Sequence, residues 1–522
     1  MQVKNYQGDC PMKFNRSSGI ILHPTSLPGP DGIGDLGPEA YRWVNFLDRV
    51  GCSLWQVLAL GPTGYGDSPY QCFSALAGNP YLVSPALLLE EGLLTRKDLA
   101  DRPVFPVDKV NYGDVIPWKL KILDRAFHHF QRSASPALQA EVAEFKNEQA
   151  FWLDDFALFM AIKEANGGVS WKDWPEALRS RELQALKEFT ERHAEAIQRH
   201  ELRQFLFFKQ WRTLRKFANE KGIQIIGDVP IFVAYDSAET WSHPELFYLN
   251  EKGLPTVVAG VPPDYFSRTG QYWGNPIYRW DFHRKSGYEW WIQRLRATLQ
   301  IVDIIRLDHF RGFAGYWEIP AKKTTAEVGK WKPGPGASLF QAIEKALGGL
   351  PIIAEDLGKI TPDVVALREQ FKLPGMKLLQ FAFSTDSSDP FLPHNFPTNC
   401  VAYTGTHDND TSQGWYRTAP ENERDFCRRY LARSGDDIAW DMIRAIWSSV
   451  AELTLAPLQD FLNLGSGARM NLPGTTGNNW IWRMPADVFT NLDLISRITE
   501  TNYLYYRTKG LVKEESVMQG HI

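Results

Sequence analysis

The sequence predicts a (β/α)8 barrel, also called a TIM barrel, with helical insertions. Eight short apolar runs have strand character, stretches of helical periodicity separate most of them, and four of the runs lead into an acidic residue. Strands that alternate with helices favour a parallel sheet, and eight such units can close into a barrel. The predicted strands are residues 18–23, 54–58, 223–228, 302–308, 351–358, 375–383, 400–410 and 446–458.

Bulk composition narrows the function classes. The 522 residues fit one barrel domain with insertions, and 44% hydrophobic and 23% charged content excludes disordered and fibrous classes. A net charge of −4 provides no basic surface for nucleic acid, and no apolar run approaches membrane-spanning length. Five cysteines without a CxxC motif predict a reduced, cytoplasmic location without structural zinc. We therefore expect no nucleic acid or membrane partner, no metal and no cofactor.

The first half of the chain begins with a strand at 18–23, a proline-rich loop, a helix at 39–50 and a strand at 54–58, which together make a βαβ unit. A loop of glycines and aromatic residues at 61–71 follows at the carboxyl end of the second strand, where barrel enzymes carry their chemistry. Residues 86–220 change to a helical period, so we predict a helical insertion subdomain within a single catalytic domain of residues 1–522. Its aromatic stripes are typical of core packing.

The second half resumes with a strand at 223–228 that stops at Asp228. Residues 258–280 have little regular pattern, and long irregular segments are uncommon unless functional, so we predict an active-site loop insertion at 245–285. A helix at 288–299 precedes the strand at 302–308. After residue 483 we expect about two helical turns, which leave little room for a C-terminal β-sandwich domain.

The strand at 302–308 carries the most informative pattern. Strand alternation directs Ile304, Arg306 and Asp308 to one face, so the cation and the carboxylate can share a space. Burial alone would raise the pKa of Asp308, and we expect Arg306 to keep this carboxylate ionised, as a nucleophile requires. A structural ion pair at the strand end explains this segment alone equally well.

Four of the predicted strands end on acids, which are Asp228, Asp308, Glu355 and Asp408. In a closed parallel barrel these strand ends face one mouth, so the four carboxylates should converge there. Clustered carboxylates fit glycoside chemistry, in which one acid attacks the anomeric carbon and another protonates the leaving oxygen. Helix capping could explain any one of the acids, and a Mg²⁺ site is open on chemistry alone, although no glycine-rich phosphate loop supports it.

Three motifs resemble the catalytic strand ends of the α-amylase clan of retaining glycosidases. They are Arg306-Leu-Asp-His-Phe-Arg-Gly, Ile353-Ala-Glu-Asp-Leu-Gly and Gly405-Thr-His-Asp-Asn-Asp. The loops at 23–30, 61–70, 262–267 and 471–475 narrow the resemblance to the 4-α-glucanotransferases, the amylomaltase or disproportionating-enzyme family. Amylases of the clan usually carry an Asn-His pair after the third strand, where this chain has Ile231, Phe232 and Val233. The glucanotransferases share that loss, which favours the transferase.

The resemblance implies a role for each candidate site residue. Asp308 would be the nucleophile, Glu355 the acid and base, and Asp408 the carboxylate that holds sugar hydroxyls in the transition state. The implied substrate-binding residues are Tyr65, Tyr70, Asp228, Trp273, Arg306 and His407. A structural role stays open for His407, as a loop cap, and for Trp273, as an anchor of its own loop.

The resemblance also implies the reaction. The chain would transfer segments of α-1,4-glucan to the 4-hydroxyl of glucose or of another glucan through a covalent glycosyl-enzyme, with malto-oligosaccharides as donors and acceptors and without a cofactor. An α-glucan hydrolase, such as an amylase or α-glucosidase, would use the same acids with water as acceptor. An inactive glucan-binding scaffold is a further alternative, but the three intact acids argue against it.

Overall fold

The computed structural model describes residues 14–263 and 267–509, and within them eight parallel strands close into a barrel, as the sequence predicts. Around the barrel the strands follow the order β1, β2, β3, β6, β9, β10, β11 and β12, and β12 pairs with β1. The barrel strands are β1 (Ser17–Ile21), β2 (Leu54–Gln56), β3 (Gln224–Pro230), β6 (Ile304–Asp308), β9 (Ile352–Ala354), β10 (Gly375–Leu378), β11 (Cys400–Tyr403) and β12 (Leu453–Pro457).

The predicted strands are at the right places, but several of them are too long. The strand predicted at 351–358 is only the short β9, so Glu355 directly follows the strand. The one at 400–410 shrinks to β11, so Asp408 lies in the loop beyond it. Both predictions included the acid in the strand, but a strand ends where its neighbours stop pairing, and that depends on the register of the whole barrel.

The side chains of β6 alternate between the inside and the outside of the barrel. Ile304 belongs to the apolar cluster inside the barrel, whereas Ile305 packs into the outer core beneath the helices. Both are fully buried. Arg306 and Asp308 therefore share the inward face with Ile304, as the alternation predicts, and β6 delivers them to the barrel mouth.

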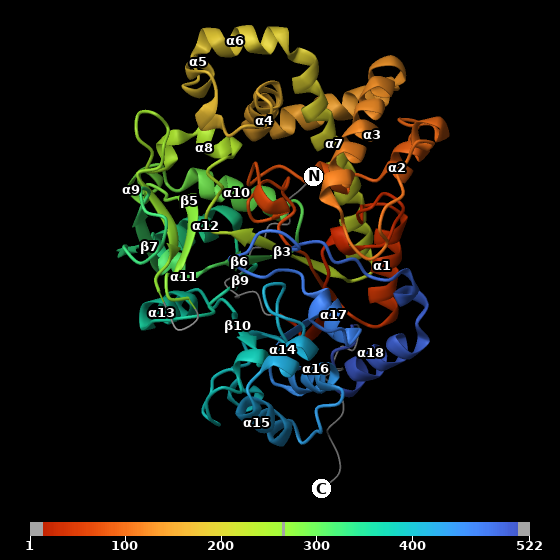
Figure 1. Cartoon of the computed structure of the whole chain (residues 1–522), viewed down its shortest axis with the longest axis vertical. Coiled ribbons are helices and arrows are strands. Elements are labelled where there is room, and N and C mark those ends of the chain that lie inside the picture. The colour runs from red at the N-terminus through yellow and green to blue at the C-terminus, as the bar shows by residue number, and fades with distance from the viewer. Residues whose placement is uncertain (1–13, 264–266, 510–522) are drawn as a thin grey trace.

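Helices cover the barrel and form a large layer at one end of the molecule. Figure 1 shows α4 to α7 together at the top and α14 to α16 at the bottom. The predicted helical insertion at 86–220 contains the long α4 and α7, which pack against each other. The helices through α10 are α1 (Pro38–Arg49), α2 (Pro85–Glu90), α3 (Tyr112–Ser133), α4 (Pro136–Ala165), α5 (Glu176–Arg179), α6 (Leu183–Arg192), α7 (Ala194–Glu220), α8 (Ala238–Ser242), α9 (Trp280–Lys285) and α10 (Glu289–Leu299).

The later helices complete the outer layer. They are α11 (Arg311–Ala314), α12 (Ala337–Leu347), α13 (Pro362–Gln370), α14 (Ser412–Thr418), α15 (Glu421–Leu431), α16 (Ile438–Ser448), α17 (Leu458–Phe461) and α18 (Leu492–Leu504). After β12 the described part of the chain contains helices and turns but no further strand, so it holds no C-terminal β-sandwich. Within the same residues, no helix has the length and apolar character to cross a membrane.

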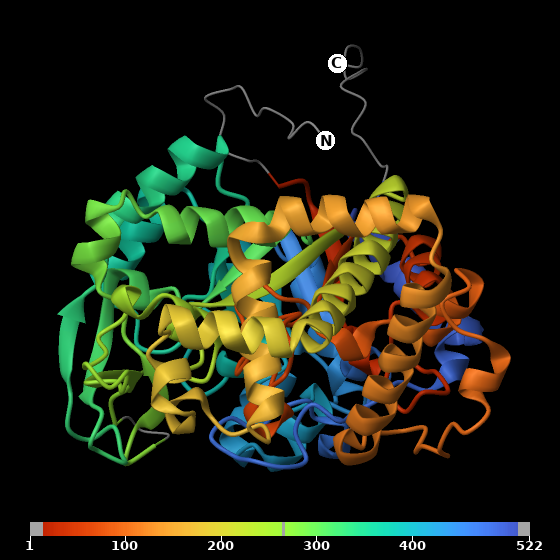
Figure 2. The same cartoon turned by 90° about the horizontal axis from the view of Figure 1, so that it is seen from above.

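A second sheet occupies one flank of the barrel, and it corrects the prediction that 258–280 is irregular. It is antiparallel and consists of β4 (Val257–Val261), β5 (Gln271–Pro276), β7 (Gly315–Pro320) and β8 (Lys330–Pro333). Glycines and prolines obscure the alternation of apolar and polar residues in β4 and β5. The strand that pairs with β4, β7, comes only after β6 in the chain. Both views place this sheet on the side opposite α2 and α3 (Figures 1 and 2).

Candidate active site

Arg306 joins two of the predicted acids. Its Nη1 donates to both carboxylate oxygens of Asp228, at 2.7 and 2.6 Å, and to Oδ1 of Asp308 at 2.9 Å. The register of β3 and β6 pairs Asp228 with Arg306, which brings the two side chains together. The side chain of Asp228 is fully buried and that of Arg306 is 3% exposed, whereas Asp308 is 29% exposed to the mouth. One buried guanidinium therefore orients a carboxylate that remains accessible.

Tyr70 and His407 extend this cluster. The hydroxyl of Tyr70 donates to Oδ2 of Asp228 at 2.7 Å, and its ring stacks on His407 with 5.1 Å between the centroids. Burial, followed by the charge of Asp228, raises the pKa of Tyr70, so the phenol stays protonated and can donate. Trp480 packs beside both rings, at 5.7 Å from Tyr70 and 6.0 Å from His407. The aromatic faces and Asp228 thus form one continuous wall.

Glu355 is held by backbone amides. Its Oε2 accepts from the N–H of His309 at 2.7 Å, and its Oε1 accepts from the N–H of Leu357 at 3.0 Å. His309 adopts the left-handed region, with φ of 53°, directly after Asp308. This conformation is uncommon for a residue other than glycine, although His adopts it more readily than most. The turn that follows Asp308 therefore also fixes the carboxyl group of Glu355.

The two acids differ in pKa. Burial raises the pKa of Asp308 to about 6, although Arg306 opposes the shift. Burial and the nearby charge of Asp308 raise the pKa of Glu355 further, to about 8. The expectation that Arg306 would offset burial at Asp308 is thus only partly right, because burial outweighs the cation. The order of the two pKa values makes Asp308 the group that loses its proton first and leaves the proton on Glu355, which is the division that acid-assisted nucleophilic attack requires.

Asp408 lies in the loop after β11, and other loops hold it. The Nδ2 of Asn471 donates to its Oδ1 at 2.6 Å, and the Nε2 of His407 lies 3.4 Å from its Oδ2. The side chain of Asp408 is 42% exposed, more than those of the strand-borne acids Asp228 and Asp308. It is therefore available to a ligand in the barrel mouth.

Trp273 and Tyr65 differ in their relation to the acids. Trp273 is half-buried on β5, and its ring meets that of His309 edge to face at 4.8 Å, which connects the second sheet to the turn after Asp308. Burial lowers the pKa of His309 to about 4, so this ring is neutral at pH 7. Tyr65 lies on the short helix Tyr65–Asp67 and is 77% exposed. Within the described residues, Tyr65 makes no hydrogen bond to any of the four acids.

Sequence reasoning assigned no role to His309, Asn471 or Trp480, which all contact the site. His309 and Asn471 belong to motifs that carry the family resemblance, but a motif does not reveal which side chain or amide a residue contacts across the barrel. Trp480 has φ of 65°, and no sequence signal marks a tryptophan for the left-handed region. Two aromatic residues of the predicted loop, Tyr265 and Phe266, lie outside the described residues.

The described residues contain no group of three or more His, Cys, Asp or Glu side chains arranged to hold a metal ion. The acids are instead satisfied by the donors named above: a guanidinium, a phenol, two backbone amides and an asparagine amide. Hydrogen bonds of this kind orient carboxylates for reaction with an organic substrate in an open barrel mouth.

Known proteins resemble this chain along most of its length. A sequence profile described as 4-alpha-glucanotransferase matches residues 22–489. A 4-alpha-glucanotransferase of Thermus thermophilus is 53% identical over 481 residues, which cover 91% of this chain and 95% of the relative. One from Synechocystis is 50% identical over 480 residues, with coverage of 91% and 95%.

Solved structures agree with these relatives. An amylomaltase from Streptococcus agalactiae in complex with acarbose superposes with a TM-score of 0.92 and 40% identity, covering 94% of this chain and 100% of that chain. The amylomaltase from Corynebacterium glutamicum, at 19% identity and a TM-score of 0.77, shares the fold over 93% of this chain and 75% of its own. With the profile match and the identity to the Thermus enzyme, these findings show that the chain belongs to the 4-alpha-glucanotransferase family.

Proposed function

We propose that this protein transfers segments of α-1,4-glucan to the 4-hydroxyl of glucose or of another glucan by a retaining double displacement. The observation that carries the mechanism is the pair of acids at the end of β6 and after β9. Arg306 orients Asp308 and opposes the rise of its pKa, whereas burial and the charge of Asp308 raise the pKa of Glu355 above it. A retaining glycosidase mechanism needs this combination of an ionised nucleophile and a protonated acid.

Asp308 is the proposed nucleophile and Glu355 the proposed acid and base. In the first step a carboxylate oxygen of Asp308 attacks the anomeric carbon, while the proton of Glu355 passes to the glycosidic oxygen of the leaving glucan. In the second step Glu355, now ionised, removes the proton from the acceptor hydroxyl, whose oxygen displaces Asp308 from the anomeric carbon. Asp408 holds sugar hydroxyls and stabilises the transition state.

The donor pocket consists of the wall built around Asp228. Tyr70 presents its ring to the reacting sugar and His407 donates to a sugar hydroxyl, while Arg306 orients Asp308 and Asp228. The stack of Tyr70 on His407 supports this assignment, because flat aromatic faces and fixed polar groups together suit a sugar ring. Tyr65, exposed on its short helix, contacts glucan units farther from the reacting bond.

Transfer rather than hydrolysis depends on what fills the acceptor side. We assign this role to the active-site insertion at 245–285, which includes β4, β5 and Trp273. The contact of Trp273 with His309 supports the assignment, because it puts an aromatic ring next to the turn that follows the nucleophile. A sugar bound there would exclude water while the intermediate persists. The helical insertion at 86–220 is a subdomain of the single catalytic domain.

The same proposal covers partners and location. The substrates are malto-oligosaccharides and longer α-1,4-glucans, with no nucleic acid, membrane or cofactor. A cytoplasmic location fits the four cysteines in the described residues, Cys52, Cys72, Cys400 and Cys427, all of which are free thiols.

Incubation with maltotriose followed by chromatographic sizing of the products tests the function. Transfer of a maltosyl unit releases glucose and lengthens an acceptor maltotriose to maltopentaose, whereas transfer of a glucosyl unit releases maltose and lengthens the acceptor to maltotetraose. An early product mixture of only glucose and maltose would mean that water is the acceptor, and the protein would then be a hydrolase. No turnover at all would favour a glucan-binding scaffold.

A further inference from the structure

The loop at 469–480 crosses the barrel mouth and is tied to the segment that carries His407 and Asp408. The backbone N–H of Asn471 donates to the carbonyl oxygen of His407 at 3.1 Å. Arg469 donates through Nη2 to the carbonyl oxygen of Asp408 and through Nε to that of Asn471, both at 2.6 Å. One guanidinium therefore clamps the backbones of two loops together.

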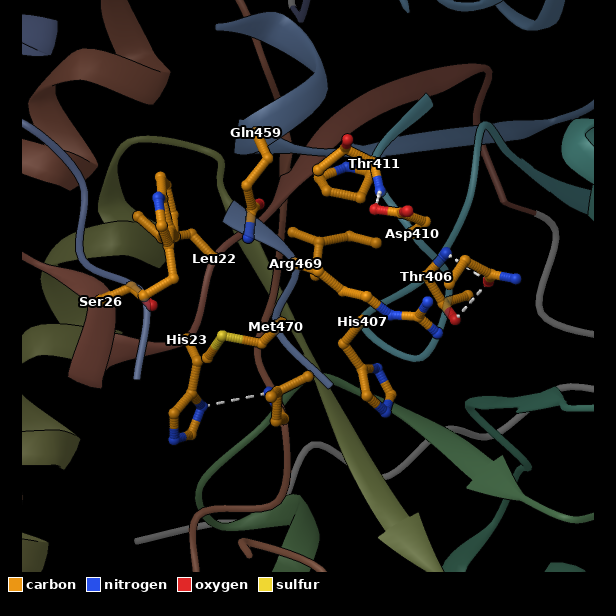
Figure 3. A pocket seen from close by; sticks show the side chains of 15 residues that line it. Leu22, His23, Ser26, Thr406, His407, Asp410, Thr411, Gln459, Arg469 and Met470 are labelled. Carbon is orange, nitrogen blue, oxygen red and sulfur yellow. Dashed lines mark hydrogen bonds between the residues drawn. The ribbon is translucent and has the colours of Figure 1, made fainter. Parts of the chain in front are cut away.

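The side chain of Arg469 lines a pocket that also contains His23, His407 and Met470. Figure 3 shows this side chain extended toward the loop that carries Thr406 and His407, with Met470 between His407 and His23. These contacts involve the peptide backbone of Asp408 and leave its carboxylate free to take another donor. That donor comes from the same loop.

The far end of the loop is fixed as well. The N–H of Trp480 donates to the carbonyl oxygen of Met470 at 2.7 Å, and the N–H of Leu472 donates to Oδ1 of Asn479 at 3.0 Å. Trp480 is 5% exposed and packs on Tyr70 and His407 in a left-handed conformation that a bulky residue rarely adopts. Such a conformation persists only where surrounding contacts impose it. The loop is therefore held at both ends, and Asn471 sits on a fixed support.

The orientation of the Asp408 carboxylate depends on Asn471. The side chain of Asp408 is 42% exposed. Among the described residues, its carboxylate accepts a hydrogen bond from Asn471. His407 is close, but its Nε2 lies 3.4 Å from Oδ2. A carboxylate on a loop with one bonded oxygen can rotate once that bond is lost, and a misplaced carboxylate loses much of its effect on a transition state.

We propose that Asn471 is a positioning residue that holds the carboxylate of Asp408 in the orientation required for transfer. The inference rests on the proposed function, because it takes Asp408 to act in the transition state. Asn471 acts through Asp408: its amide donates to Oδ1 and leaves Oδ2 for the sugar. Arg469 and Trp480 keep the loop in place, so the amide is already oriented before substrate arrives.

The first test is Asn471→Ala, assayed by maltotriose disproportionation. We expect kcat to fall about 10- to 100-fold, the range seen when a group that orients a functional ligand is removed. KM should change little, because the lost interaction matters in the transition state. The matched control is Asn399→Ala, which removes an exposed amide that donates to the carbonyl oxygen of Lys372 at 3.0 Å. The control should keep its kcat, and thermal unfolding should show both variants folded. A folded Asn471→Ala with unchanged kcat would overturn the inference.

A double-mutant cycle separates this inference from the proposed function. If Asn471 acts through Asp408, adding Asn471→Ala to Asp408→Asn should cause little further loss of kcat. A full multiplicative loss would show that Asn471 acts elsewhere, while the role of Asp408 would stand. Retention of activity by Asp408→Asn alone would instead remove Asp408 from the mechanism and Asn471 with it.

Asn471→Asp gives a readout that a purely structural role would not move. Two facing carboxylates repel, so one of them takes up a proton more readily than usual, and its O–H can then replace the lost amide donor. The rate of the variant relative to wild type should therefore rise as pH falls. His407, Arg469, Tyr70 and Asp308 also face Asp408, but they are present in both enzymes, and the ratio of rates removes their shared contribution. A ratio independent of pH would contradict the inference.

Discussion

Asp308 and Asp408 belong to one site but are held by different kinds of structure. Asp308 is the last residue of β6, and its partner Arg306 stands on the same face of the same strand. Asp408 lies in a loop, and its partner Asn471 comes from another loop 63 residues away. The orientation of the first is set by barrel register and buried charge, and that of the second by the packing of one loop on another.

The two carboxylates also differ in how they tolerate the loss of a hydrogen-bond partner. The cluster of Asp228 and Arg306 is almost fully buried, so loss of one partner would leave an uncompensated charge in the core. The side chain of Asp408 is 42% exposed, and water can replace a lost partner. Damage to the strand-held cluster should therefore affect stability and chemistry together, whereas damage around Asp408 should affect chemistry alone.

The largest effect is expected where the strand-held acid itself is changed. Asp308→Asn keeps the shape of the side chain and removes the nucleophile, so kcat should fall by about 10⁴-fold or more. Binding of maltotriose, measured by calorimetry, should persist, because the wall around Asp228 is unaltered. Substantial remaining turnover would mean that another group is the nucleophile.

Glu355→Gln should have the next largest effect. The amide cannot give a proton to the leaving glucan, and loss of a general acid typically slows a reaction about 10²- to 10⁴-fold. The first step should recover with α-maltosyl fluoride, whose leaving group needs no proton. The comparison is between kcat/KM values for the fluoride and for maltotriose. Equal losses on both donors would exclude Glu355 as the acid.

Arg306→Lys tests the residue that orients Asp308, and its effects can be compared with those of Asn471→Ala. Lysine keeps the charge but lacks the planar guanidinium whose Nη1 meets both Asp228 and Asp308. We expect kcat to fall about 10²-fold, as when one charge-stabilising donor is lost. The melting temperature should fall for this variant and stay near wild type for Asn471→Ala. Equal melting temperatures would remove the proposed contrast between the two supports.

The pH dependence of kcat/KM should report the different pKa values of Asp308 and Glu355. Activity should fall as pH drops through about 6, because Asp308 takes up a proton, and as it rises through about 8, because Glu355 loses one. The two limbs belong to the interacting pair rather than to one residue each. Beyond either limb the rate should change about tenfold per pH unit. In Glu355→Gln the alkaline limb should disappear, and its persistence would assign that limb to another group.

The smallest effect on total turnover is expected at Trp273. Trp273→Ala removes the ring that meets His309, so acceptor sugar should bind less well and water should enter more often. Donor consumption should fall only a few-fold, whereas the ratio of hydrolysis to transfer should rise. Sizing of maltotriose products over time measures that ratio. An unchanged ratio would take Trp273 out of the account of transfer.

The sequence was sufficient for the barrel and for the shared face of Arg306 and Asp308. Both follow from patterns along one strand, and alternation on a strand does not depend on distant partners. Strand ends were less well predicted, as Glu355 and Asp408 illustrate, since pairing stops where neighbouring strands stop. The second sheet was missed because β4 pairs with β7, which lies beyond β6 in the chain.

The alternation of strands and helices and the identity of the acids therefore follow from the amino-acid order alone, because local periodicity and residue chemistry are carried by contiguous residues. The order of the two pKa values, the contact of Trp273 with His309 and the hydrogen bond from Asn471 to Asp408 arise from the folded barrel. Burial and contacts between loops depend on how distant segments pack, and that geometry exists only once the barrel has closed.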